Sequence, residues 1–583
     1  MHRTATTNHS KSNRQEKGVK NAFTHPFFKP LVVAVMLLFS FTFSGNAQQI
    51  RLDNLKEQYS KKSFMRVNGG VSANAVFYDG NNPNRDPFTW VLSGNVNFSF
   101  FNQLNLPFTF NLNNLGGSYT YPTMPNRLSI HPSYKWITGH IGDVSMSFSP
   151  YTLGGHQFTG VGVELSPDNF PVKVSAMYGR LLKATEYKPE ERLGMPAYKR
   201  MGYGAKVLYD KEKYSIGMSL FGARDHNSSV QIPDSLDLLP HSNLAMSWEA
   251  GFRLIKNLSL TAEYGLSILV RDNRLPSSIT KSSYHAFKAG LSYQLMKNTI
   301  GFGYERIDPE YQSLGAYYFT NDLENFTFSF ARPFFKDKLT MALNVGIQHD
   351  NLDNNKSEQT NRFVGAANIS YNHNENLSAS FSFSTFQTYT NIKSQFDYIN
   401  GMTNYDNLDT LDYTQLSQNI NLNVSWNFGK SESKKHSLNV NLSFQEAADK
   451  RGGITRTGGA SQFYNLATSY GLLFVPQSLR LTASANVTYS TIGTNEMITY
   501  GPSLGAVAKL FKKKLTTGAS VSYNVSVDDG RWQNSVVNFR WNAAYQFLKR
   551  HNLSIVLIEQ SRNMKARPTT NDFTTTLSYS YSF

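Results

Sequence analysis

The chain alternates apolar and polar residues over many short segments. At the C-terminus every second residue from Leu577 to Phe583 is apolar or aromatic, and the residues between them are serines. The same pattern occurs over 420–428, 438–444 and 479–489. Successive side chains of a β-strand point to opposite faces, so each segment has one apolar face and one polar face. The pattern predicts strands that separate an apolar environment from a polar one.

Charged residues inside these segments fall on the polar face. Arg480 alternates with Leu479 and Leu481, and Glu263 and Glu305 take the equivalent position in their own segments. An Arg that faced lipid at the bilayer midplane would cost about 2 to 4 kcal/mol. If the apolar face contacts lipid, these charged residues therefore point into the lumen of a barrel.

The connections between the segments alternate between short and long. Short turns are predicted near Asn102, Gly142, Asp168, Lys211, Lys256, Lys297, Lys336, Asn374, Ser431, Gln477, Lys513 and Lys549. The longer connections are 182–198, 225–242, 308–323 and 392–411. Outer-membrane barrels have tight turns in the periplasm and long loops outside. With both termini periplasmic, this spacing predicts a large antiparallel up-and-down barrel of about 26 strands, or 22 to 24 if hairpins are miscounted.

The N-terminus has the order of a secretory signal peptide. A polar, basic stretch over 1–30 precedes the apolar run Leu31–Phe43, and the small residues Ser44–Ala47 follow. A run of about 13 residues is short for a membrane span, although a single membrane anchor is the alternative. No later apolar run approaches the length of about 18 residues that a transmembrane helix needs. A membrane location therefore requires strands.

The predicted organisation has three parts: a signal peptide (1–47), a short periplasmic segment (48–65) and an outer-membrane β-barrel (66–583). A plugged transporter would carry a much longer domain ahead of its first strand. The prediction is therefore a barrel without a plug domain, located in the outer membrane of a Gram-negative cell after export.

Composition agrees with strands rather than helices. Aromatic residues make up 14% of the chain and charged residues 17%. The chain has no cysteine, so disulfides do not stabilise it. The net charge of +16 raises the question of nucleic-acid binding. The basic residues are scattered at turns and form no stripe on one element, which disfavours a nucleic-acid partner.

Candidate catalytic and metal-binding residues are few. His131, His140 and His156 lie near Asp143 in sequence, but no pair has HxH or HExxH spacing. The glycine-rich segment 451–459 lacks the lysine and the strand-to-helix context of a phosphate-binding loop, so it indicates a loop turn. The sequence predicts no enzyme activity, no catalytic residue, no metal site and no cofactor.

The processing junction Ala47-Gln48-Gln49, the alternating last strand and the terminal Phe583 resemble outer-membrane proteins of the Bacteroidota. The resemblance is to a class and not to a family with a known activity. It implies that Tyr579, Tyr581 and Phe583 form a C-terminal signal for the barrel-assembly machinery. It also implies outer-membrane lipids and lipopolysaccharide as surroundings.

Two functions remain open from the sequence. The first is a porin-like channel for hydrophilic solutes, suggested by the polar lumen. The second is a non-catalytic scaffold subunit of an envelope complex for secretion, surface export or nutrient uptake, with a protein partner, because so wide a barrel must be filled. The candidate lumen or constriction residues are Arg192, Lys199, Arg200, Glu263, Glu305 and Arg480.

Overall fold

The computed structural model describes residues 65–583 apart from 82–84, 102, 115–126, 188–195, 232, 234–235, 237, 277–279, 317–318, 357–358, 360, 386–387, 391–413, 452–453, 493–494 and 566. Residues Met65–Phe583 form one compact unit. The predicted signal peptide and nearly all of the predicted segment 48–65 lie outside the described residues, so both stay predictions.

The described residues of this unit form β-strands and one short 3-10 helix, η1 (Asn227–Ser229). The first half contains β1 (Met65–Asp79), β2 (Phe88–Phe100), β3 (Leu104–Asn113), β4 (Arg127–Ile130), β5 (Ser133–Tyr134), β6 (Ile137–Ser147), β7 (Gly154–Leu165), β8 (Val172–Leu182), β9 (Lys199–Asp210), β10 (Tyr214–His226), β11 (Ser242–Ile255), β12 (Leu258–Val270), β13 (Lys281–Leu295) and β14 (Asn298–Ile307). The second half contains β15 (Leu323–Phe334), β16 (Leu339–His349), β17 (Asn361–Asn374), β18 (Leu377–Ser384), β19 (Thr388–Thr390), β20 (Thr414–Phe428), β21 (Lys434–Arg451), β22 (Ile454–Phe474), β23 (Leu479–Ile492), β24 (Asn495–Leu510), β25 (Leu515–Asp528), β26 (Arg531–Leu548), β27 (His551–Met564) and β28 (Arg567–Ser582).

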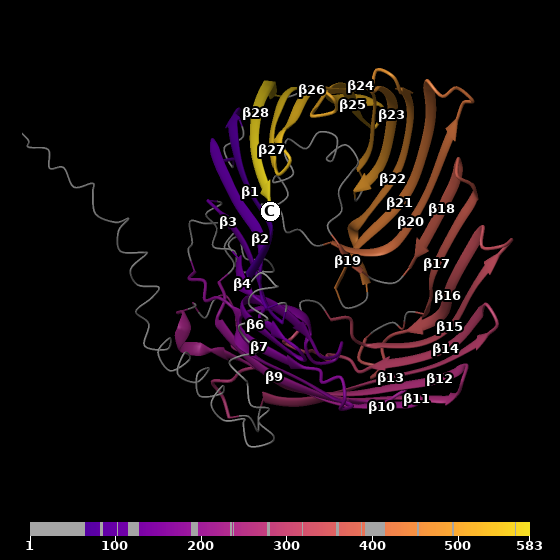
Figure 1. The fold of residues 1–583 in the computed structure, drawn as a ribbon. Helices are drawn as coiled ribbons and strands as arrows, with labels where there is room; N and C mark the ends of the chain where they lie inside the picture. The colour runs from indigo at the N-terminus through magenta and orange to yellow at the C-terminus, as the bar shows by residue number, and fades with distance from the viewer. Residues whose placement is uncertain are drawn as a thin grey trace, which may run out of the picture. The chain divides into compact units, whose positions relative to one another are not determined.

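Neighbouring strands in the chain pair antiparallel, and the first strand pairs with the last (Figure 1). Gly69 and Phe583 exchange both backbone hydrogen bonds, each with an N···O distance of 3.0 Å, next to this seam. β4 and β5 share one position between β3 and β6, and β18 and β19 share one position next to β20. The described strands therefore form a closed antiparallel barrel of 26 positions, as the sequence predicts.

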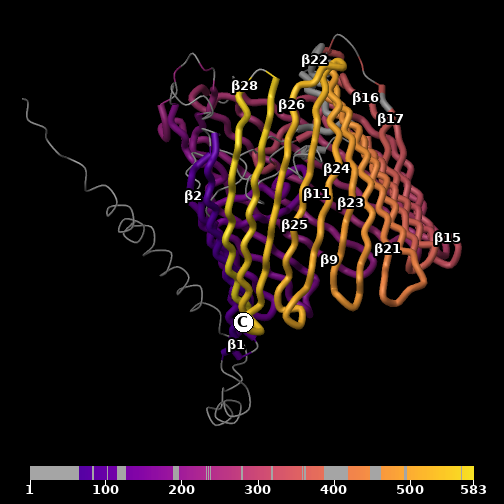
Figure 2. The backbone as a smooth tube through the Cα atoms, turned by 90° about the horizontal axis from the view of Figure 1, so that it is seen from above, coloured from indigo at the N-terminus to yellow at the C-terminus, as the bar shows by residue number. Residues whose placement is uncertain are grey.

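The connections are short throughout one end of the barrel, where β1 begins and β28 ends, and Figure 2 shows the C-terminus there. The opposite end carries the long connections, although from β21 to β28 its connections are also only two residues long. We call the first end the tight-turn end and the opposite one the long-loop end. The predicted turn at Gly142 is wrong, because this residue lies inside β6 with a φ of +103°. A Cβ there would come within 2.0 Å of the Leu128 carbonyl oxygen, so the glycine permits close approach of two strands. The turn is instead at Lys135–Trp136.

The glycine-rich segment also differs in detail from its prediction. Residues 451 and 454–459 belong to the ends of β21 and β22, which form one long hairpin. Within the described backbone the segment continues two paired strands and does not open into a phosphate-binding loop.

The barrel surface carries the predicted apolar face. In β28, Leu577 and Tyr579 are 40% and 38% exposed, whereas the alternate residue Thr574 is fully buried. Large exposed apolar side chains occur on strands all around the barrel. Apolar area left in water is unfavourable by roughly 25 cal/mol per Å², so this surface needs an apolar environment. Among the described residues, no helix is long and apolar enough to cross a membrane.

Candidate functional site

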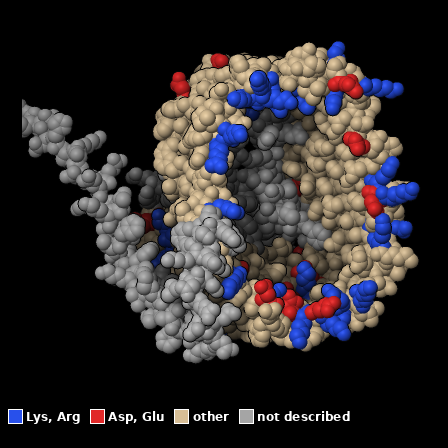
Figure 3. Space-filling view, in the orientation of Figure 1, with Lys and Arg blue, Asp and Glu red and all other residues tan. Residues whose placement is uncertain are grey.

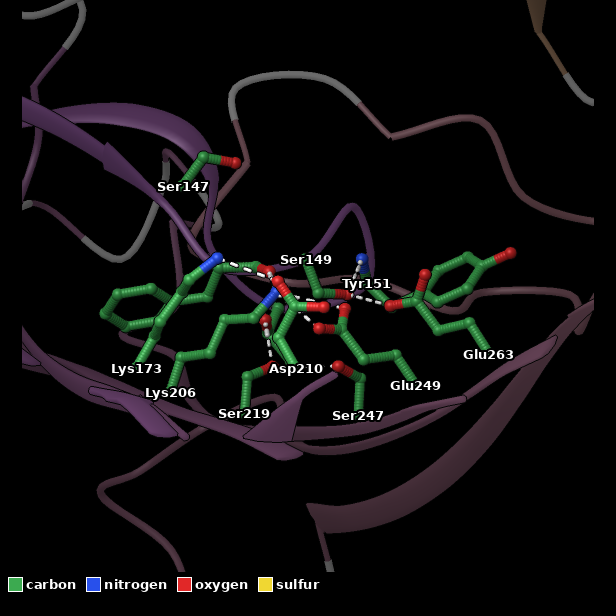
Figure 4. A network of polar contacts seen from close by, with 12 residues as sticks. Ser147, Ser149, Tyr151, Lys173, Lys206, Asp210, Ser219, Ser247, Glu249 and Glu263 are labelled. Carbon is green, nitrogen blue, oxygen red and sulfur yellow. Dashed lines mark hydrogen bonds and ion pairs between the residues drawn. The ribbon is translucent and has the colours of Figure 1, made fainter. Parts of the chain in front are cut away.

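The connection between β6 and β7, Phe148–Leu153, packs against the inward side chains of the barrel wall, and Figure 4 shows its Ser149 and Tyr151 beside Lys206, Glu249 and Glu263. Pro150 has no N–H for a strand ladder, so alternation ends here. Tyr151 is 1% exposed and Leu153 is 0% exposed, although both belong to a connection. Connections normally run over the surface, so this one is held by specific contacts.

An apolar cluster holds the connection from one side. Its wall residues are the inward-facing side chains Val144, Met146, Phe158, Met177, Leu181, Phe221 and Ala223 of β6, β7, β8 and β10. Phe148 and Leu153 of the connection and Leu314 of the β14–β15 loop pack against them. This part of the lumen is therefore a solid apolar core, where a polar lining was expected.

Two carboxylates of the neighbouring strands β12 and β14 hold the connection through its hydroxyl groups. Ser149 Oγ donates to Glu263 of β12, and the Tyr151 backbone N–H donates to Ser149 Oγ at 3.0 Å. The Tyr151 hydroxyl donates to Glu305 Oε1 of β14 at 2.9 Å. Burial, together with the negative charge of Glu305, raises the pKa of Tyr151 far above its usual range. Tyr151 therefore stays a neutral donor at any physiological pH.

A lysine completes the polar contacts beneath the connection. Lys206 Nζ of β9 donates to the Phe148 carbonyl oxygen at 2.7 Å and lies 2.8 Å from Glu249 Oε1 of β11. Thr152 and Ser219 have their hydroxyl oxygens 2.9 Å apart, and both groups are buried. Each polar group that enters the core thus has a partner, which offsets the cost of removing it from water.

The β14–β15 loop also reaches this place. The Tyr311 hydroxyl donates to the Tyr151 carbonyl oxygen at 2.8 Å, and Ser313 Oγ donates to the Thr152 carbonyl oxygen. The Gly154 N–H donates to the Gly315 carbonyl oxygen at 2.9 Å. Two connections that are distant in sequence are therefore joined inside the β6–β14 side of the barrel.

The inward face of β22–β28 is different. Its buried residues are mostly polar, with Val536 and Ile558 as apolar exceptions, and include Asn465, Asn486, Thr488, Asn524, Asn538, Gln560 and Thr574. Thr488 Oγ1 donates to Asn465 Oδ1 at 2.7 Å, and Asn465 Nδ2 donates to Ser443 Oγ at 3.2 Å. We call this face the polar wall.

The structure brings two of the predicted lumen residues together. Glu263 and Glu305 both hold the Ser149–Tyr151 segment, whereas Arg480 is exposed on β23, on the face opposite to its neighbours Leu479 and Leu481. Arg192 lies outside the described residues.

The other predicted residues lie near the long-loop end. Arg200 forms two hydrogen bonds with Asp225 of β10, from Nε at 2.7 Å and from an Nη at 2.9 Å. Asp225 also accepts from the His241 backbone N–H at 3.0 Å, so this pair fastens the β10–β11 loop. Lys199 begins β9, and its backbone N–H donates to Ser229 Oγ at 2.9 Å. Lys199 and Arg200 therefore stabilise the β10–β11 loop.

The histidines form a pair and a separate residue. His131 and His140 have their Nδ1 atoms 2.9 Å apart, and Glu164 lies 3.6 Å from His140. Ser129 Oγ is 3.2 Å from His131 but is 7% exposed, so a substrate has little access. His156 is buried and bonds the Gln157 carbonyl oxygen. Among the described residues no group of three His, Cys, Asp or Glu could hold a metal ion.

The C-terminal aromatic residues lie at the closing seam. The Tyr579 hydroxyl is 2.7 Å from His551 Nδ1, and the Tyr581 and Phe583 rings are 5.3 Å apart. Phe583 ends the strand that closes the barrel on β1. Its role as an assembly signal, like the Bacteroidota origin, stays a prediction.

Sequence reasoning missed Ser149, Tyr151 and Lys206. A signal was present in Ser147–Gly155, where apolar residues at 148, 151 and 153 depart from alternation around Pro150. A strand end that keeps apolar residues without alternation indicates a connection that is buried.

Comparison with known proteins gives limited information. No protein-family model matches the chain, and no curated protein matches it. Among solved structures, the P pilus usher translocation pore is similar at 12% identity, over 89% of this chain and 99% of that one, with a TM-score of 0.36. The FrpB iron transporter of Neisseria meningitidis is similar at 10% identity, over 88% of this chain and 82% of that one, with a TM-score of 0.36. A mutant Rh. blastica porin is similar at 12% identity, over 52% of this chain and 99% of that one, with a TM-score of 0.26. With TM-scores this low, the likenesses add nothing about function.

Proposed function

We propose that the protein is an outer-membrane β-barrel that conducts hydrophilic solutes along the polar wall, past a constriction formed by Phe148–Leu153. The single observation that carries the proposal is this connection, which fills one side of the lumen while the polar wall lines the other. Loops that fold inward and narrow a polar lumen are how channels limit the size of a solute.

The membrane location is supported by the outer surface. A closed barrel satisfies every backbone N–H and C=O in hydrocarbon, because it has no free edge. The exposed Leu577 and Tyr579 face away from the buried threonines of β28. We expect the purified protein to require detergent, and free solubility in plain buffer would contradict the location.

Conductance in planar bilayers tests the channel. We expect discrete current steps from the purified protein. The double variant Glu263→Ala, Glu305→Ala removes both carboxylates that hold the connection, so we expect larger or noisier steps. The matched control is Glu375→Ala in the tight turn between β17 and β18, which should leave the steps unchanged. A silent bilayer across several salts and sugars would overturn the proposal.

A scaffold subunit of an envelope complex remains the second candidate, and the apolar core favours it. A core that fixes two connections is more rigid than a gate needs to be. Purification in mild detergent followed by mass spectrometry tests this candidate. A stoichiometric companion protein would support it, and a solitary barrel would count against it.

A further inference from the structure

An apolar hollow lies on the outer face of β12–β16. It has a volume of about 520 Å³, and its lining includes Leu260, Ala289, Leu291, Phe302, Tyr304 and Phe326. Phe302 and Ile347 at this face are 59% and 63% exposed. Small-molecule pockets have volumes of roughly 300 to 1,000 Å³, so the hollow is large enough for part of a ligand.

Aromatic pairs stiffen the hollow. The rings of Phe302 and Phe328 have centroids 5.3 Å apart, and those of Tyr304 and Phe326 are 5.0 Å apart. The Tyr304 hydroxyl donates to Glu324 Oε1 at 2.6 Å, which fixes the ring. The shape therefore exists before any ligand arrives, and little side-chain entropy is lost on binding.

A cation lies on the same face nearer the tight-turn end. Arg332 follows Phe326, Phe328 and Phe330 at every second position of β15, and its guanidinium lies 4.8 Å from the centre of the Phe334 ring. Arg332 lies four positions after Phe328, or about 13 Å along the strand. Among the described ion pairs none includes Arg332. An outward Arg is tolerated at the headgroup level of a bilayer, so it marks that level.

The adjoining turns add charge and apolar side chains. Lys336 and Lys338 follow directly in the β15–β16 turn, and Lys297 of the β13–β14 turn pairs with Asp337 at 2.8 Å. Phe335 is 71% exposed with a φ of +53°. Phe511 of the β24–β25 turn has the same backbone conformation and similar exposure, so the feature that distinguishes this face is the hollow beside the charges. Figure 3, which views this end, shows Lys and Arg around the barrel rim.

We infer that this face binds an anionic phospholipid of the leaflet at the tight-turn end. The acyl chain would occupy the hollow between the aromatic pairs, and the headgroup phosphate would contact Arg332 and Lys336. The inference rests on the membrane location of the proposed function but not on conductance. Because binding is measured in detergent, a silent channel and a failed lipid site give separate results.

Native mass spectrometry of the purified full chain tests the inference, with titration of phosphatidylglycerol, phosphatidylcholine or glycerol 3-phosphate. We expect the first phosphatidylglycerol to bind at least tenfold more tightly than phosphatidylcholine. Arg332→Gln, Lys336→Gln, Lys338→Gln should weaken phosphatidylglycerol tenfold. The matched control Lys512→Gln, Lys513→Gln, Lys514→Gln removes three charges from the β24–β25 turn and should change binding less than twofold.

The variant Ala289→Phe separates the hollow from the charges, since it fills the hollow and changes no charge. We expect it to weaken phosphatidylglycerol at least fivefold, while circular dichroism confirms that the barrel is folded. Equal binding of phosphatidylcholine, or equal losses in the two triple variants, would overturn the inference. Tight binding of glycerol 3-phosphate alone would also overturn it, because the site would then recognise free phosphate.

Discussion

The β6–β14 side and the β22–β28 side of this barrel have similar outer faces but different inner faces. Along β6–β14 the inward residues include large apolar side chains such as Phe158 and Phe221, and two connections pack on them. Along β22–β28 the buried inward residues are mostly polar, such as Asn486 and Thr574, and only Val536 and Ile558 of the described ones have apolar side chains. Both sides keep exposed apolar residues on the outer face.

This difference shows that the residues on the outer face and those on the inner face of a strand are selected by different surroundings. In the membrane location that we propose, lipid selects apolar outward residues all around the ring. The inward residues depend on what lies in the lumen. Where a connection enters, burial favours apolar packing with paired polar groups, and elsewhere the face can remain polar. The following changes test this contrast.

The largest effect is expected in the apolar core. Phe221→Ala should lower the free energy of unfolding by about 3 to 5 kcal/mol, because it leaves a cavity among fully buried residues. Asn465→Ala on the polar wall removes the bonds to Ser443 and Thr488 and should cost about 1 to 3 kcal/mol. Urea unfolding in detergent measures both, and equal costs would remove the contrast between the two sides.

A smaller effect is expected at the contact between the connection and β12. Ser149→Ala removes a hydrogen bond to the Glu263 carboxylate and should cost about 1.5 to 3 kcal/mol. Ser72→Ala serves as the control, since its hydroxyl faces Ser93 across β1 and β2 at 2.8 Å and loses a neutral bond worth about 0.5 to 1.5 kcal/mol. A larger loss in the control would show that the connection is not held by this contact.

Low pH should destabilise the contact between the β14–β15 loop and the β16–β17 loop, which Asp322 holds. Burial favours the neutral form of Asp322, but Lys356 and the backbone N–H groups of Leu352 and Asn351 outweigh it and hold the pKa of this carboxyl below its usual range. The resulting stability is fully present above the unfolded pKa of about 3.9 and is lost as the pH falls through the lower folded value.

Thermal unfolding between pH 6 and pH 2 measures this loss. Asp322→Asn should be less stable than the natural protein at pH 6 and should show a shallower fall on acidification. Asp353→Asn changes an exposed carboxyl of the neighbouring β16–β17 loop and should behave like the natural protein. Parallel pH profiles for all three proteins would contradict the assignment.

The smallest effect on stability is expected on the conducting side. Arg480→Glu should shift ion selectivity from anions toward cations with little change in unfolding, because Arg480 is exposed on the face that lines the lumen. Lys549→Glu makes the same charge change at an exposed residue of the turn between β26 and β27, and should leave selectivity nearly unchanged. Reversal potentials under a salt gradient distinguish the two variants. The proposed path along the polar wall fails if only the Lys549 variant shifts the reversal potential.

The alternation of the chain determined the strands, their number and their outer face. Leu577 and Tyr579 point outward, as the alternation predicts. With a period of two, placing the apolar residues of a strand on the outer face leaves only the inner face for the polar ones. Gly142 shows the limit of this reasoning. A glycine in a polar stretch indicates a turn, yet here it permits close approach of two strands, and only the pairing reveals this.

The lumen was decided by tertiary structure. Glu263 and Glu305 could be placed on the inner face from their parity, but not against Ser149 and Tyr151, which lie more than a hundred residues away in sequence. Local pattern reports which face of a strand a residue occupies, because backbone geometry fixes it. It indicates at most that a connection is buried, as in Ser147–Gly155, and not which strands that connection packs on, because those contacts join segments that are distant in sequence.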